Sequence, residues 1–255
     1  MDTEFLYVGR DLTVAQFDAH EASPNRVVVT LDYWRSPEER HLPSPFCRSF
    51  FKGVGITQVH IFATWNHWYH TDELIEVGAI IRSQFPSAEM TLFGGSMGGY
   101  GAFRLHATVC AEMIVAFSPQ AEVHAAYDTR FGVDWEDVSA RDRFFEGTIL
   151  PRKTFVIYDP YVPDDRRHVD TLRRYCNFFE IKFPLFGHSV DRALYQTGAF
   201  EGLMTELLEG VLTASRVSYW RRRNRRASSD YCRQLEAHRL ARCGGDRSMG
   251  AVLTA

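Results

Sequence analysis

Residues 94–98 read Gly-Gly-Ser-Met-Gly, so that a serine stands between two glycines at the spacing G-x-S-x-G. This spacing is typical of a sharp turn from a strand into a helix, where a strained backbone presents the serine hydroxyl. Glycine is needed two positions before and after the serine because a side chain there would collide with neighbouring backbone. A turn that only packs helix on strand is the alternative, but an apolar run before the motif and a helical pattern after it favour chemistry. We therefore predict that Ser96 is a nucleophile and that the Met97 amide donates to a developing oxyanion.

His188 is the candidate general base. A serine hydroxyl is a weak nucleophile until a base removes its proton, and the order along such a chain is serine, acid, histidine. His188 directly follows the last apolar run that we predict as a strand, whereas His124 and His168 come too early and His238 lies in a basic segment. We therefore expect His188 to reach Ser96.

Three acids compete for the third position after the predicted strand at 154–158, and they are Asp159, Asp164 and Asp165. Asp159 directly precedes a proline and is more typical of a turn residue. Asp164 and Asp165 lie further along, and one of them could cap the helix that we expect near residue 166. We choose Asp165 as the residue that orients the imidazole, with Asp164 as the next candidate.

A second oxyanion donor is expected from the loop after the strand at 26–31. The amide of Tyr33 is our candidate, with its neighbours nearly equivalent. Asp32 would oppose an oxyanion unless it is paired, with Arg35 as the candidate partner. The alternative is that Asp32 is a structural acid that fixes the loop.

Residues 64–70 read Thr-Trp-Asn-His-Trp-Tyr-His and follow the predicted strand at 59–63, at the edge where open α/β sheets bind ligands. Such side chains suit stacking on a flat group or sugar ring and hydrogen bonding to its substituents. The predicted substrate contacts are Trp34, Asn66, Trp68 and Tyr69. The alternative is that Trp65 and Trp68 pack in the core. Because no third ligand is placed beside the two histidines, we predict no metal and no cofactor.

The elements that must position these residues alternate between short apolar runs and longer helical patterns, which is typical of a mostly parallel sheet flanked by helices. The predicted strands cover 5–17 as a strand or hairpin, 26–31, 59–63, 90–93, 113–117, 154–158 and 179–183. The predicted helices begin at Thr71, which we expect to be a cap, and near residues 100, 166 and 200. The long connection at 118–152 is predicted to be a lid or a small helical insertion.

Together these features resemble the α/β-hydrolase superfamily over residues 5–210. The turn Gly-Gly-Ser-Met-Gly-Gly-Tyr at 94–100, combined with Asn-His-Trp-Tyr at 66–69, is similar to a group of small bacterial serine hydrolases. The resemblance implies an α/β-hydrolase fold and a Ser-His-Asp triad. The chain departs from the superfamily in lacking an H-G-G-G oxyanion motif, which bears on details of the site more than on the fold.

Composition bounds the class of protein. With 255 residues, 45% of them hydrophobic, we expect one catalytic domain at 1–214 and a basic helical tail at 215–255. The first ten residues hold no long apolar stretch and no run of eighteen apolar residues follows, so we expect neither secretion nor a membrane span. Five cysteines without a CxxC pair favour reduced thiols in the cytoplasm.

Charge is distributed unevenly along the chain. The net charge is −3, but residues 215–255 hold ten arginines against three acidic residues, which leaves −10 on the preceding part. Short basic segments can bind nucleic acid or anionic lipid, but more often they are solvated or dock on an acidic surface of their own chain. We therefore expect the tail to pack on the body of the protein or on a partner, and we expect no nucleic-acid partner.

These features predict a carboxylic-ester hydrolase that acts on a small acylated compound, with an acylated sugar as one candidate, through an acyl-serine intermediate. One alternative is an acyltransferase with the same triad. Another is a non-catalytic binding protein on a hydrolase fold. The ester and the oligomeric state stay open.

Overall fold

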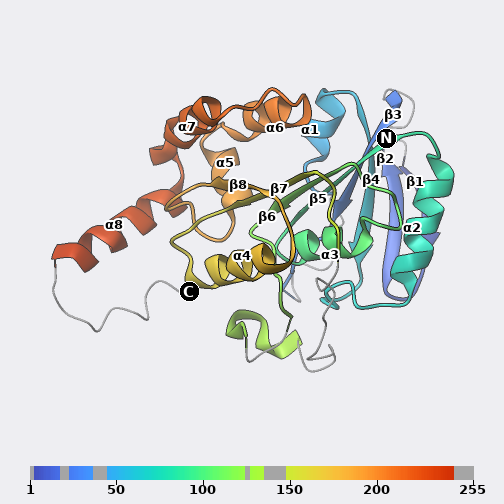
Figure 1. The fold of residues 1–255 in the computed structure, drawn as a ribbon, viewed down its shortest axis with the longest axis horizontal. Coiled ribbons are helices and arrows are strands. Elements are labelled where there is room, and N and C mark those ends of the chain that lie inside the picture. The colour runs from blue at the N-terminus through green and yellow to red at the C-terminus, as the bar shows by residue number, and fades with distance from the viewer. Residues whose placement is uncertain (1–2, 18–22, 37–44, 124–126, 135–147, 244–255) are drawn as a thin grey trace. The chain divides into compact units, whose positions relative to one another are not determined.

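A computed structural model of the chain describes residues 3–17, 23–36, 45–123, 127–134 and 148–243 (Figure 1). Eight strands form one sheet in the order β1-β2-β4-β3-β5-β6-β7-β8. They are β1 (Thr3–Val8), β2 (Leu12–Phe17), β3 (Ser23–Leu31), β4 (Ile56–Ala63), β5 (Glu89–Gly95), β6 (Met113–Phe117), β7 (Lys153–Tyr158) and β8 (Phe179–Lys182). Strand β3 runs parallel to β4 and β5, and β5 parallel to β6, whereas β2 is antiparallel to both β1 and β4. The predicted mostly parallel sheet, with a hairpin at its start, is confirmed.

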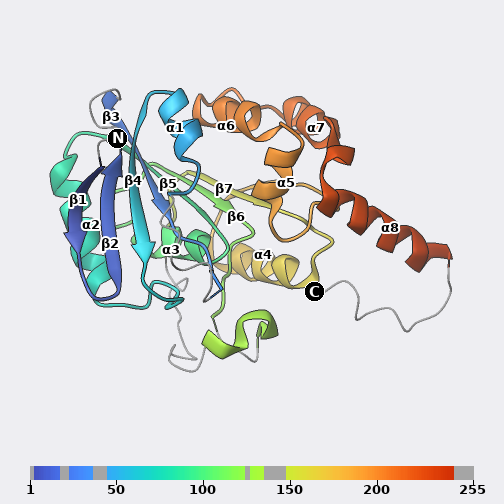
Figure 2. The same ribbon diagram turned by 180° about the vertical axis from the view of Figure 1, so that it is seen from behind.

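Helices flank this sheet. They are α1 (Arg48–Gly53), α2 (Glu73–Gln84), α3 (Met97–Leu105), α4 (Pro163–Tyr175), α5 (Val190–Gln196), α6 (Phe200–Leu208), α7 (Ala214–Arg222) and α8 (Ser229–Cys243), with short 3-10 turns η2 (Thr129–Asp134) and η3 (Arg225–Ala227). Helix α1 lies on one face of the sheet, and α2 and α3 lie on the other (Figures 1 and 2). No helix in the described part of the chain is long and apolar enough to cross a membrane.

The chain divides into two compact units. The first unit comprises Met1–Val156 and His168–Glu180, and the second comprises Ile157–Arg167 and Ile181–Ala255. The division passes through α4 and through the last two strands. A separate tail beginning at residue 215 stays a prediction.

The core of the first unit is built by its parallel strands. Val27, Val28 and Val29 on β3 are buried, as are Leu92 on β5 and Ile114 on β6. Parallel strands covered on both faces bury consecutive side chains, which explains why these strands read as unbroken apolar runs. Their carboxyl ends carry the loops that build the candidate site.

In the second unit, the basic helices α7 and α8 pack on their neighbours. Trp220 of α7 is buried over Gly202 of α6, where a Cβ would collide with the indole, and the indole N–H donates to Glu206 at 3.1 Å. Tyr231 of α8 is buried against Phe186, with ring centroids 5.7 Å apart. The packing expected of the basic segment is therefore present within this unit.

The helices differ from the predictions in four places. Helix α3 begins at Met97 rather than near residue 100, because glycines of low helix propensity hide its first turn in the sequence. At α2, Asp72 occupies the cap position, while the Thr71 hydroxyl accepts from the Glu73 amide at 3.3 Å. Helices α1 and α5 were not predicted. Part of the predicted lid lies outside the described residues, which include 118–123, 127–134 and 148–152 of that connection.

Candidate active site

Ser96 stands at the junction of β5 and α3 in a strained conformation. Its φ of 51° and ψ of −117° lie where a residue with a side chain is rarely found. The Ser96 amide donates to the Phe117 carbonyl at 2.8 Å, and the Ser96 carbonyl accepts from the Tyr100 amide at 3.1 Å. The side chain is half-buried, and the helix begins at the next residue. This is the strand-turn-helix context that the G-x-S-x-G spacing predicts.

The glycines on either side are required by close backbone contacts. A Cβ on Gly94 would collide with the carbonyl of Gly98. A Cβ on Gly98 would lie 2.6 Å from the Leu31 carbonyl oxygen and 2.8 Å from that of Asp32. The start of α3 therefore sits directly against the loop that follows β3, the loop predicted to carry the second oxyanion donor.

The loop after β3 is held by the buried Asp32. Its carboxylate forms an ion pair with Arg35 and accepts from the His60 ring at 2.9 Å and the Ala63 amide at 3.0 Å. The charge of Asp32 is therefore paired with Arg35, the candidate partner, and the same carboxylate also holds the loop, which is the role given by the alternative interpretation.

Tyr33 is the predicted second oxyanion donor, and its peptide plane is also fixed. The buried Tyr69 hydroxyl donates to the Asp32 carbonyl at 3.0 Å. A carbonyl and the following N–H point in opposite directions across one planar peptide, so this bond sets the direction of the Tyr33 amide. The Tyr33 side chain itself is exposed.

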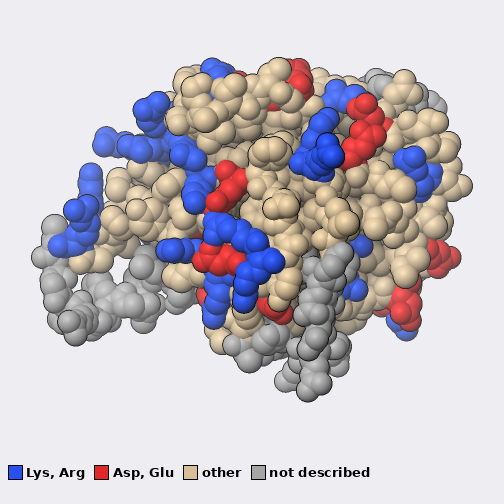
Figure 3. Space-filling view, viewed as in Figure 1, with Lys and Arg blue, Asp and Glu red and all other residues tan. Residues whose placement is uncertain are grey.

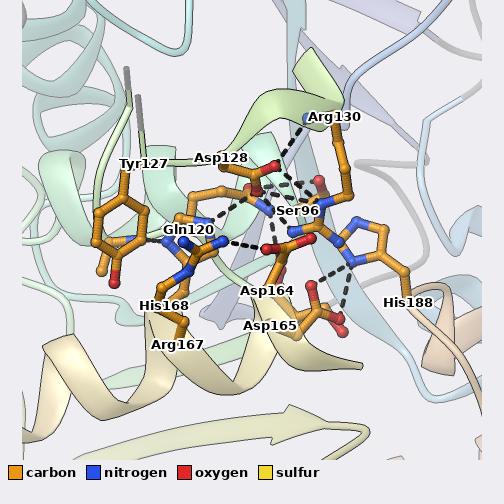
Figure 4. Close-up of polar contacts among 12 residues, drawn as sticks. Ser96, Gln120, Tyr127, Asp128, Arg130, Asp164, Asp165, Arg167, His168 and His188 are labelled. Atoms are coloured by element: carbon orange, nitrogen blue, oxygen red, sulfur yellow. Dashed lines mark hydrogen bonds and ion pairs between the residues drawn. The ribbon is translucent and has the colours of Figure 1, made fainter. Parts of the chain in front are cut away.

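Gln120 touches the predicted nucleophile, although the sequence did not single it out as a site residue. The Ser96 hydroxyl donates to the Gln120 side-chain oxygen at 3.3 Å, and Gln120 is fully buried (Figure 4). It follows β6, the parallel neighbour of β5, by way of Ser118 with φ of 39°. The signal that could have found it is the meeting of the carboxyl ends of adjacent parallel strands.

The segment that carries Gln120 is tied to α4 by a buried acid and histidine. The His168 ring donates to Asp128 at 3.0 Å and accepts from the Ala121 amide at 3.1 Å, so the neutral imidazole fits both bonds (Figure 4). Arg130 also pairs with Asp128. Burial by itself would raise the pKa of Asp128, but the bonds from His168 and Arg130 hold that pKa well below its usual value.

In the second unit, Asp165 is the acid that contacts His188. Its carboxylate oxygens lie 2.8 and 2.9 Å from the His188 Nδ1 atom (Figure 4). Asp165 is fully buried in the first turn of α4, while His188 is part-exposed. A carboxylate at Nδ1 favours the tautomer in which Nδ1 carries the proton and Nε2 is the acceptor, which is the form that a general base needs.

The two competing acids have other partners. Asp164 forms an ion pair with Arg167. Asp159 accepts from the Gly187 amide at 2.7 Å and the Tyr161 amide at 2.9 Å, so it closes its own turn and anchors the loop that carries His188. Burial raises the pKa of Asp159 to about 6.

Comparison with known proteins finds relatives by structure. No family model and no curated protein matches the chain. The capsule O-acetyltransferase of Neisseria meningitidis serogroup A aligns with a TM-score of 0.60 at 12% identity, covering 80% of this chain and 93% of that one. A Staphylococcus aureus protein described as an esterase aligns with a TM-score of 0.53 at 16% identity, covering 81% and 83%. An Agrobacterium tumefaciens protein described as an α/β hydrolase aligns with a TM-score of 0.51 at 15% identity, covering 82% and 97%. The protein has the α/β-hydrolase fold. The narrower likeness to small bacterial serine hydrolases stays a prediction.

Within this α/β-hydrolase fold, the aromatic segment after β4 is mostly internal. Asn66 is buried and exchanges two hydrogen bonds with the Arg35 backbone, at 2.9 and 3.1 Å. Trp68 and Tyr69 are fully buried, and both have positive φ. These positions favour the alternative of core packing for Trp68. Trp34 is only half-buried, and its ring lies 5.7 Å from that of Phe131.

The histidines of this segment also have contacts within the chain. Burial lowers the pKa of His67, whose ring bonds the Tyr69 amide and the Asp11 carbonyl. The His70 ring stacks on Tyr100 and bonds its hydroxyl at 3.0 Å. No group of three or more potential metal ligands occurs among the described residues.

Proposed function

We propose that this protein is a serine hydrolase that cleaves carboxylic esters of small acylated compounds through an acyl-Ser96 intermediate. The observation that carries the proposal is the strained, half-buried Ser96 at the point where β5 enters α3. A structural serine does not need that conformation, which costs on the order of 1–3 kcal/mol and is typical of functional sites.

In the proposed mechanism, Nε2 of His188 accepts the Ser96 proton as the hydroxyl oxygen attacks the ester carbonyl carbon. The C–O bond to the leaving alcohol then breaks, and the imidazolium gives its proton to that alcohol. Water, deprotonated by the same nitrogen, next attacks the acyl-enzyme and releases the acid. Asp165 orients the ring and stabilises the imidazolium in each step.

The oxyanion that forms on the carbonyl oxygen is assigned to the amides of Met97 and Tyr33. The Met97 amide lies in the first turn of α3, where helical N–H groups have no partner within the helix and carry partial positive charge. The peptide that carries the Tyr33 amide is held by Tyr69, so this donor is pre-organised before substrate arrives.

The substrate surface is assigned to Trp34, together with Phe131 of η2. Asn66, Trp68 and Tyr69 are buried and are proposed to support that surface. Asn66 and Tyr69 bond the Arg35 and Asp32 backbone, and the Trp68 ring lies 5.2 Å from that of Phe131. A half-buried aromatic surface suits an acylated sugar among the small acylated compounds.

Acyl transfer to an alcohol or amine acceptor is the second candidate. It uses the same intermediate, and the alignment with an O-acetyltransferase over most of both chains favours keeping it. Assays of ester turnover at increasing concentrations of an acceptor alcohol distinguish acyl transfer from hydrolysis. A transferase forms mainly the new ester at acceptor concentrations far below that of water, whereas a hydrolase continues to release acid.

The proposal is tested by intact-mass analysis after incubation with a fluorophosphonate. We expect one adduct on the wild-type protein, none on Ser96→Ala, and labelling slowed by about a hundredfold or more in His188→Ala. Ser83→Ala, an exposed serine on α2, and His238→Ala are the matched controls and should label as wild type. A folded wild-type protein that stays unmodified would contradict the proposal and favour a non-catalytic binding protein.

The choice of acid is tested by neighbouring variants. Asp165→Asn should slow labelling by about a hundredfold, because an amide at Nδ1 favours the wrong tautomer. Asp164→Asn should leave the rate unchanged, since that carboxylate pairs with Arg167. The reverse result would move the role to Asp164.

A further inference from the structure

A pocket in the second unit, apart from the residues assigned to catalysis, is lined by arginine side chains. Its volume is about 250 Å³. It is lined by Pro184, Leu185 and Phe186 before His188, by Ser218, Arg221 and Arg222 of α7, by Arg225 of η3 and by Tyr231 of α8. Figure 3 shows Lys and Arg side chains gathered over α7 and α8 on the face that it draws.

The charge of this pocket is not balanced by acids of the described chain. None of the lining residues is acidic. On the neighbouring helices, Glu206 pairs with Arg216, and Asp230 pairs with Arg192 and Arg233. Glu201 of α6 and Glu236 of α8 do not line the pocket. Within residues 148–243, Arg221, Arg222 and Arg225 form no ion pair with an acid. Three guanidinium groups around one concavity repel one another unless an anion lies between them.

The arginine side chains are also held in place. Arg225 lies over the Tyr231 ring at 5.3 Å, and the Arg222 Nε atom donates to the Ser218 carbonyl at 3.1 Å. The Nε atom of Arg221 is buried and has no hydrogen-bond partner among the described residues. Arg221 is half-buried, and this burial lowers its pKa. A buried N–H donor of this kind gains most from an acceptor supplied by a ligand.

We propose that this pocket binds the phosphoryl group of a small phosphorylated compound. Guanidinium groups present planar pairs of N–H donors that match the oxygens of a phosphoryl group, and several can share one such group. The volume lies near the lower end for small-molecule sites, so it suits a phosphate or pyrophosphate with a short apolar neighbour against Pro184 and Leu185. This site is independent of the chemistry proposed for Ser96.

Calorimetric titration of the full chain with inorganic pyrophosphate, and separately with inorganic phosphate, tests the proposal. We expect saturable binding of at least one of them, weakened tenfold or more in Arg221→Gln and in Arg225→Gln. Arg221→Lys keeps the charge but loses the paired donors, so it should also weaken binding. Arg239→Gln, an exposed site on α8 outside the pocket, removes the same charge and should bind as wild type.

Two results would overturn the proposal. One is the absence of saturable binding by a folded wild-type protein. The other is an equal loss in Arg239→Gln, with a mixed-sequence oligonucleotide bound more tightly than pyrophosphate, which would indicate a diffuse nucleic-acid surface. Thermal unfolding of each variant verifies that it is folded. Ser96→Ala should bind pyrophosphate as wild type does, so failure of the proposed hydrolase activity is distinguishable from failure of this site.

Discussion

At the scale of single residues, the candidate site depends on backbone positions that tolerate no extra atoms. Ser96 keeps an unfavourable φ because β5 and α3 hold both of its neighbours in place. Gly98 permits this, since the carbonyls of Leu31 and Asp32 occupy the space that a Cβ would take. Because Gly98 has no Cβ, the start of α3 beside the nucleophile lies directly against the loop that is predicted to carry the second oxyanion donor.

Gly98→Ala should abolish fluorophosphonate labelling and lower the free energy of unfolding by about 1–3 kcal/mol, because the added methyl forces the β3 loop away from α3. Gly95→Ala is the matched control, since a Cβ there meets its nearest atoms at 3.9 Å. Urea unfolding and the labelling rate are the measurements. Equal behaviour of the two variants would show that the close approach at Gly98 has no role.

At the scale of elements, the segment after β6 is fastened by one buried network. The Asp128 carboxylate, which directly precedes η2, accepts a hydrogen bond from His168 of α4. His168 in turn accepts a hydrogen bond from the amide of Ala121, the residue next to Gln120. The segment that includes Gln120 is thus positioned by a carboxylate that must be ionised to accept from both His168 and Arg130. Stability of this element should therefore depend on pH.

Asp128→Asn should lower the free energy of unfolding at pH 7 by about 3 kcal/mol, because it leaves buried donors without their anion. The pKa of Asp128 is lowered by folding, so its contribution is present above the unfolded value near 3.8 and is lost as pH falls through the lower folded value. The difference in free energy of unfolding between Asp128→Asn and wild type should therefore become smaller below about pH 4. Urea unfolding at pH 7 and at pH 3 measures it. Asp170→Asn, half-exposed on α4, should change stability by less than about 0.5 kcal/mol. A difference that is the same at both pH values would contradict the assignment.

At the scale of the whole molecule, the basic segment is an integral part of the second unit. Trp220 packs into the space left by Gly202, and the Ser229 amide donates to the Gln196 side chain at 3.2 Å. Arg192 of α5 pairs with Asp230 of α8. Positive charge from residues 215–243 is therefore held on folded helices, where several guanidinium groups can converge on one ligand.

Trp220→Ala should increase amide hydrogen exchange in α7 and α8 by tenfold or more, because it removes the largest buried side chain that joins α7 to α6. Exchange in β3 to β6 should not change. Tyr219→Ala, an exposed aromatic residue on the same helix, is the control. Unchanged protection of α7 in the Trp220 variant would mean that this packing does not hold the helix.

The sequence by itself determined the alternation of strands and helices, the turn at Ser96 and the identity of the residues available to it. These are local properties, since hydrophobic period, glycine spacing and chain order do not depend on distant contacts.

Tertiary structure decided the rest. Asp159, Asp164 and Asp165 lie within seven residues, and only the packing of the α4 turn places one carboxylate against His188. Gln120 meets Ser96 because two parallel strands end side by side. The sequence does not tell which aromatic residues at 65–69 are exposed, whereas the structure shows that Trp68 and Tyr69 are buried. The arginine pocket arises where α7, η3 and α8 converge, and convergence in space is what a linear pattern of charge cannot specify.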